Sequence, residues 1–124
     1  MQQLQNFAPL IARLFIGGFF LLSGLGKLGD VAGFTGYLVS GGLPAFLAWP
    51  AILFEIAVGL AMIAGFRANL VALAGAAFSV VAALLYHNNL ADQMQMIMFF
   101  KNFAIAGGFL MIFAHGAGAY AVDK

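Results

Sequence analysis

The sequence predicts an all-α fold: an integral membrane four-helix bundle, with a glycine-rich re-entrant or interfacial segment between its first two spanning helices. Hydrophobic residues make up 65% of the 124 positions and charged residues only 7%, a composition that no soluble domain of this size could cover with polar surface. Four apolar stretches each have about the 20 residues that a helix needs to cross ~30 Å of hydrocarbon. Within these stretches the charged residues are Arg13, Glu55 and Lys101.

The four predicted spans use most of the chain, so we expect a single domain over residues 1–124 without a separate soluble domain. Pro9 is expected in the first turn of the first span, and Pro44 opens the second, where a proline is tolerated. No Lys or Arg precedes the first apolar stretch, which argues against a cleaved signal peptide. The predicted spans cover residues 7–26, 44–65, 70–86 and 96–114.

Residues 28–43 form the longest segment outside the spans and mix five glycines with apolar side chains. The glycines argue against a rigid helix, since glycine is a poor helix former, and the apolar residues argue against a solvated loop. We therefore expect a re-entrant or interface-lying segment packed over one end of the bundle, with Asp30 close enough to pair with Lys27. A loosely ordered linker is the alternative.

Glu55 lies in the middle of the second span, where an ionisable group is costly unless it faces the bundle interior and finds a partner. At 1.5 Å per residue, Arg13 lies ~9 Å from the face that holds the N-terminus and Lys101 ~8 Å from the opposite face. Each cation is then about 6–7 Å from the carboxylate along the membrane normal. The prediction is a buried Arg13–Glu55–Lys101 column with one excess positive charge, which would favour an anionic ligand.

Each member of this column also has a simpler interpretation. Arg13 and Lys101 could extend toward the headgroups with their aliphatic stems in lipid, and Glu55 could be a neutral carboxyl group that bonds a neighbouring helix.

Three further polar residues lie close to the ends of the spans. Lys27 follows the first span and is expected at the membrane interface, and Asn102 lies beside Lys101. His87 ends the third span and reads as an interfacial polar residue, with a role as ligand or proton carrier as the alternative. The candidate binding residues are therefore Arg13, Lys27, Glu55, His87, Lys101 and Asn102.

Several kinds of chemistry are poorly supported by the residues present. The chain has no cysteine, which excludes disulfides, thiol catalysis and cysteine-ligated clusters. A net charge of +1 argues against nucleic acid as a partner. His87 and His115 are predicted at opposite membrane faces, so neither a bis-histidine haem nor a clustered metal site is expected. No catalytic residue is proposed, whereas an apolar slot with few polar groups would suit a quinone.

Orientation follows from the basic residues outside the spans. The side that carries both termini has Arg67 and Lys124, and the other side has Lys27. Because cytoplasmic loops carry the excess of Lys and Arg, we expect both termini in the cytoplasm.

The chain resembles the DoxX family of small bacterial inner-membrane proteins over nearly its full length. The resemblance implies a four-helix bundle in the bacterial inner membrane. It also implies an association with membrane redox systems, because family members accompany quinol oxidase, thiosulfate:quinone oxidoreductase and oxidative-stress complexes. The residues that carry it are Arg13, Ser23-Gly24-x-x-Lys27-Leu28, Gly42-Leu43-Pro44, Glu55-x-x-x-Gly59-Leu60, Gly65-x-Arg67, His87, Lys101-Asn102, Gly107-Gly108 and Gly116-Ala117-Gly118-x-Tyr120 before Asp123.

Three functional hypotheses follow. The first is an accessory subunit, without an activity of its own, that binds a small hydrophobic or anionic molecule such as a quinone and works with redox partners in the lipid bilayer. The second is a transporter of a small solute or proton, with Glu55 as the midplane relay; four spans are few for this task, so a homo-oligomer would be needed. The third is a structural assembly protein whose charges fix helix register.

Overall fold

The structure is a computed structural model that describes residues 2–86 and 90–121, and the described residues form helices and turns without a β-strand. Four stretches are long and apolar enough to cross a membrane, which confirms the predicted all-α membrane fold. The elements are α1 (Gln2–Leu28), α2 (Val31–Ser40), the 3-10 helix η1 (Ala45–Leu47), α3 (Ala48–Ala64), α4 (Ala68–Tyr86) and α5 (Gln93–His115).

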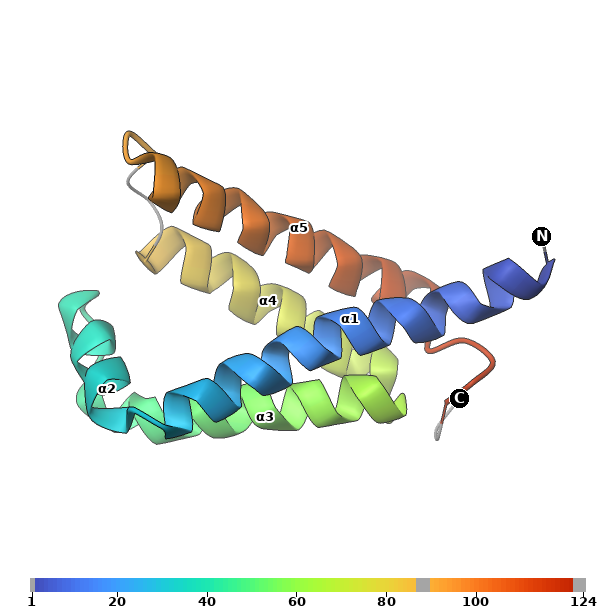
Figure 1. Cartoon of the computed structure of the whole chain (residues 1–124), viewed down its shortest axis with the longest axis horizontal. Coiled ribbons are helices and arrows are strands. Elements are labelled where there is room, and N and C mark those ends of the chain that lie inside the picture. Colours follow the sequence, from blue (N-terminus) through green and yellow to red (C-terminus); the bar gives the residue numbers. More distant parts are fainter. Residues whose placement is uncertain (1, 87–89, 122–124) are drawn as a thin grey trace.

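The spanning helices form two antiparallel pairs (Figure 1). α1 packs along α3, and α4 packs along α5, whereas contacts between the two pairs are fewer. The pairs lie closest where α3 turns into α4 and diverge toward the end that carries α2 (Figure 1). The start of α1 and the C-terminal segment lie at the end where the pairs meet (Figure 1).

Small residues bring the helices of each pair together. A Cβ atom on Gly59 of α3 would lie 2.7 Å from the backbone nitrogen of Leu21 and 2.8 Å from the carbonyl oxygen of Gly17, both in α1. In the second pair, the ring of Phe109 occupies the space beside Gly75. The close backbone approach in the first pair and the contact of a ring with glycine in the second supply the packing on which helix association in lipid depends.

The buried core lies at the end where the pairs meet. Met62 and Phe109 are fully buried there, and the alanines of α4 leave room for them, since a cluster of buried apolar side chains joins α1, α3, α4, α5 and the C-terminal segment. Gly65 ends α3 in the left-handed region with a φ of 78°, a conformation that favours glycine. α1 begins at Gln2, so Pro9 lies inside the helix and not in its first turn as expected.

The segment between α1 and α3 differs from the expectation for residues 28–43. Despite its glycines it contains a helix, α2, whose first turn is capped by Asp30 accepting a hydrogen bond from the backbone nitrogen of Gly33 at 3.0 Å. The cap satisfies a free N–H group and favours helix initiation, so the alternative of a loosely ordered linker is wrong. Asp30 therefore caps α2, and the expected pairing with Lys27 is not formed. Ten residues are too short to span hydrocarbon, and α2 lies over one end of the bundle (Figure 1).

Candidate functional site

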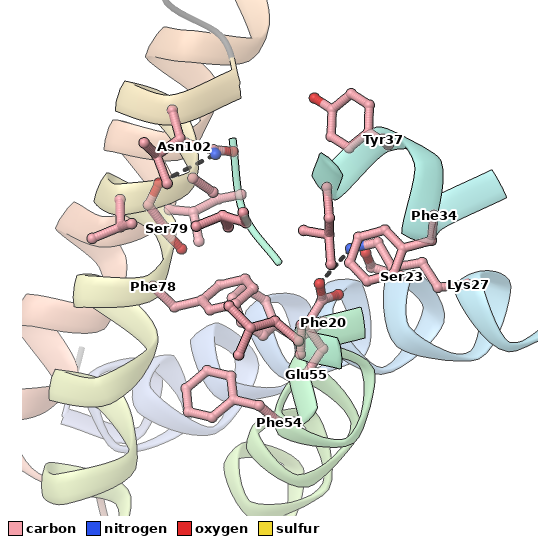
Figure 2. Close-up of a pocket in the computed structure, with 18 of the residues that line it drawn as sticks. Phe20, Ser23, Lys27, Phe34, Tyr37, Phe54, Glu55, Phe78, Ser79 and Asn102 are labelled. Carbon is pink, nitrogen blue, oxygen red and sulfur yellow. Dashed lines mark hydrogen bonds and ion pairs between the residues drawn. The ribbon is translucent and has the colours of Figure 1, made fainter. Parts of the chain in front are cut away.

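A cavity of about 620 Å³ lies between the two helix pairs at the end that carries α2. All five α-helices contribute to its lining. Phe20 of α1, Phe54 of α3 and Phe78 of α4 lie together at one side of it (Figure 2). Phe78 is in contact with the other two, at ring-centroid distances of 5.9 Å to Phe20 and 5.1 Å to Phe54. These rings separate the cavity from the core, in which Phe20 also packs on Phe109 at 5.2 Å.

One wall of the cavity carries an ion pair between Lys27 of α1 and Glu55 of α3 (Figure 2). The Glu55 side chain is 3% exposed and that of Lys27 is 30% exposed, so the carboxylate is buried and the ammonium group reaches the cavity. Lys27 also lies over the ring of Phe34 in α2, at 4.8 Å from its centroid. The buried carboxylate is therefore neutralised by Lys27 of α1, which Glu55 of α3 and Phe34 of α2 hold in place.

Gly24 explains how the two side chains meet. A Cβ atom at this position would lie 3.2 Å from the backbone nitrogen of Ile56 and 3.3 Å from the Cβ atom of Glu55. α1 and α3 are thus close at the level of the carboxylate. Lys27 lies one turn further along α1, and the side chains of a helix tilt back toward its N-terminus, so Lys27 is aimed at Glu55.

The opposite wall carries Lys101 and Asn102 of α5. The Asn102 side chain donates from Nδ2 to the carbonyl oxygen of Ser79 in α4 at 3.2 Å (Figure 2). Lys101 Nζ lies 4.9 Å from the ring centroid of Phe19 in α1. Its side chain thus crosses the space between the helix pairs instead of extending toward the headgroups, so the simpler interpretation of Lys101 is wrong.

Arg13 lies outside this cavity and has a different environment. Its side chain is fully buried, and its three nitrogen atoms donate to four backbone carbonyl groups. Nη1 donates to Met62 and Ile63 at 3.0 and 3.1 Å; Nε donates to Ala117 at 3.0 Å, and Nη2 to Tyr120. Met62 and Ile63 belong to the last turn of α3, the end of a helix that attracts a cation.

The predicted Arg13–Glu55–Lys101 column is therefore wrong in its pairing. Arg13 connects the end of α3 to the C-terminal segment, and Lys27 pairs with Glu55 in place of Arg13 and Lys101. The sequence places Lys27 at the membrane interface, after a span that ends at residue 26, whereas α1 continues to Leu28.

The cavity brings together four of the six candidate residues: Lys27, Glu55, Lys101 and Asn102. Arg13 is separate, and His87 lies outside the described residues. Tyr37 and Ser23 also line the cavity and were not among the candidates. Of these, Ser23 had a signal in the sequence, since it lies four residues before Lys27 and hence on the same face of α1.

The charged residues that line the cavity are two lysines and one glutamate, which gives a formal charge of +1. Among the described residues there is no group of three or more His, Cys, Asp or Glu side chains that could hold a metal ion. The polar atoms that face the cavity are suited to hold a hydrogen-bond acceptor or an anion at one end of an apolar chamber.

Comparisons with known proteins agree with a membrane location. The family model DoxX matches residues 8–88. The chain is 37% identical to the inner membrane protein YqjF of Escherichia coli over 124 residues, which cover all of this chain and 95% of that protein. It is 29% identical to the inner membrane protein YphA of Escherichia coli over 122 residues, which cover 93% of this chain and 87% of that protein. No solved structure matches the chain.

The role of Arg13 predicts a loss of stability on substitution. Arg13→Gln would remove most of the donors to four carbonyl groups, and we expect the free energy of unfolding in detergent to fall by about 3 kcal/mol. Arg13→Lys keeps the charge but not the planar donor geometry, so it should restore only part of this loss. The exposed Arg67 is the control, and Arg67→Gln should change stability by at most about 0.5 kcal/mol. Equal effects of Arg13→Gln and Arg67→Gln would contradict the assignment.

The ion pair predicts strong coupling between Lys27 and Glu55. Lys27→Met would leave a carboxylate buried without a partner, and we expect a loss of about 2–3 kcal/mol after allowing for the partial exposure of Lys27. In the double variant Lys27→Met/Glu55→Gln the charge is gone, so most of this loss should be recovered. Chemical unfolding of the two single variants and the double variant measures the coupling, and additive losses would show that the residues act independently.

Proposed function

Because this chain belongs to the DoxX family and has four membrane-length helices around a charged cavity, we propose that it binds an amphipathic small molecule within the membrane. The observation that carries the proposal is the cavity itself, about 620 Å³ in volume and lined on most sides by apolar residues. Small-molecule sites have this size and this combination of apolar walls with a few polar groups.

The chemistry of the walls supports a ligand with a flat or apolar body and a polar head. Phe20, Phe54 and Phe78 would pack against the body, since aromatic rings contribute large apolar contact areas. Lys101 and Asn102 lie at the other side and would hold oxygen atoms of the head. We propose quinones as the first class to test, because a quinone has both parts.

We propose that the protein binds this molecule without reacting with it, as an accessory subunit of a membrane redox system. Among the described residues the cavity presents donors and one neutralised carboxylate, and neither is itself a redox centre. The redox reaction would then belong to a partner protein, which this chain would supply with the bound molecule or stabilise.

A variant that fills the cavity tests the binding proposal. Ala82 of α4 lines the cavity, whereas Ala77 of the same helix is exposed on the outside of the bundle. In lipid nanodiscs we expect a short-chain ubiquinone to quench the fluorescence of Trp49, the single tryptophan, which precedes the cavity-lining Pro50. Ala82→Phe should weaken this binding at least about tenfold because it occupies the ligand volume.

Ala77→Phe adds the same side chain to the same helix and should leave the affinity within about twofold. Equal affinities of the two variants would place the quinone outside the cavity. Absence of binding by any amphipathic probe, with both variants folded, would favour the structural assembly protein. Solute or proton flux into proteoliposomes that stops in Ala82→Phe would favour the transporter.

We also propose that the protein lies in the bacterial inner membrane with both termini in the cytoplasm. Both relatives are inner membrane proteins. Lys27 is engaged by Glu55 inside the bundle, so it is not a charge of a loop. Arg67 lies in the turn between α3 and α4, on the side of the termini, and the sequence ends in Lys124. An excess of Lys and Arg favours the cytoplasmic side.

Single cysteine substitutions test this orientation, because the chain itself contains no cysteine that a maleimide could label. Ala91 lies just before α5, and Ala119 follows it; both are exposed. In intact spheroplasts a membrane-impermeant maleimide should label Ala91→Cys at once and Ala119→Cys only after permeabilisation. The reverse order of labelling would place the termini in the periplasm.

A further inference from the structure

The cavity carries a positive charge that no carboxylate in its lining balances. Glu55 is engaged by Lys27, and the remaining charged residue of the lining is Lys101. Among the described residues the ion pair of Lys27 and Glu55 is the one salt bridge. Lys101 is thus left with an aromatic ring as its neighbour, the side chain of Phe19.

The place of Lys101 in α5 makes this imbalance costly. It lies eight residues after the start of the helix at Gln93, about 12 Å along the helix axis, and ~8 Å inside the predicted span, which begins at residue 96. A charged side chain at such a depth is expensive in a membrane and usually faces a partner or a water-filled cavity. A cation–π contact offsets only part of that cost, so the ammonium group is an open site for an anion.

The contrast with Arg13 strengthens this interpretation. Arg13 is equally within the apolar part of the chain, and its nitrogen atoms are all occupied by carbonyl groups. Lys101 has no such set of carbonyl partners among the described residues, and it faces an open chamber together with Lys27 and Asn102. Of the basic residues in the spanning helices, Arg13 has its carbonyl partners and Lys27 has Glu55, whereas Lys101 has neither kind of partner among the described residues.

We infer that the molecule bound in this cavity is an amphiphile with a single anionic head, which Lys101 neutralises while the phenylalanine-lined chamber holds the apolar body. This inference rests on the proposed binding function and names the class of ligand. Asn102 lies next to Lys101 and presents an amide to the same space, and Lys27 faces it from the other wall. A carboxylate or phosphate between these groups would accept charge-assisted hydrogen bonds.

Two sources supply such a head within a membrane: a single-chain carboxylate or an anionic phospholipid. Dodecanoate and phosphatidylglycerol represent them, and their neutral counterparts are methyl dodecanoate and phosphatidylcholine. Native mass spectrometry of the full chain in detergent gives the apparent affinity of each. We expect the anionic member of at least one pair to bind the wild type about 10- to 100-fold more tightly than its neutral counterpart.

The charge of Lys101 should be the origin of this preference. In Lys101→Met the ratio of anionic to neutral affinity should fall to within about twofold, whereas Lys101→Arg should keep most of it. Arg67→Gln removes a positive charge outside the cavity and should leave the ratio unchanged. These ratios compare two ligands on one variant, so they do not depend on small changes in the stability of that variant.

Three results would overturn the inference. Equal affinity for the anionic and neutral members of both pairs would show that the head need not be charged. An unchanged ratio in Lys101→Met would place the anion elsewhere. Tight binding of a neutral quinone that Ala82→Phe abolishes, without binding of either anionic probe, would contradict the inference and leave the binding function standing. If no probe of any kind binds, the proposed function itself fails.

Discussion

The ion pair between Lys27 and Glu55 is the interaction on which the arrangement of this protein depends. Glu55 lies halfway along α3, where hydrocarbon offers no water to solvate it, so the helix requires a cation at that level. Lys27 supplies it from α1, and the small residues Gly17, Gly24 and Gly59 bring the two backbones close enough for the pair to form. Once the pair is made, no carboxylate of the cavity lining is left for Lys101.

Much of the fold follows from the sequence alone, because composition and the length of the apolar stretches predict a membrane helix bundle whatever the individual apolar residues are. The importance of Glu55 also follows, since depth alone makes an acidic residue exceptional. The partner of Glu55 does not follow, because depth along idealised spans does not set which residues of two helices face each other. With Gly17 opposite Gly59, counting along the antiparallel helices places Arg13 beside Ile63 and far from Glu55.

The other partners of Arg13, in the C-terminal segment, do not follow from this count. Arg13 donates hydrogen bonds to backbone carbonyl groups of α3 and of the C-terminal segment. Every residue has a carbonyl group, so the sequence does not indicate which of them accept a hydrogen bond from a side chain. The cavity could not be predicted from the sequence either, because it arises from the angle between the two helix pairs. The helix α2 is compatible with the five glycines of residues 28–43 because three of them, Gly29, Gly41 and Gly42, lie outside it, and Asp30 caps its first turn.

Residue size explains why one end of the bundle is closed and the other is hollow. Within each pair the contacts are made by glycine and alanine, which let the helices touch. Between the pairs, Phe20, Phe54 and Phe78 form a layer of rings, and beyond it the pairs diverge (Figure 1). The same rings therefore complete the core on one side and form the wall of the cavity on the other. The lysine that faces this chamber without a carboxylate is then a consequence of the packing, and the ligand that we propose for the chamber would have to match both its apolar wall and its charge.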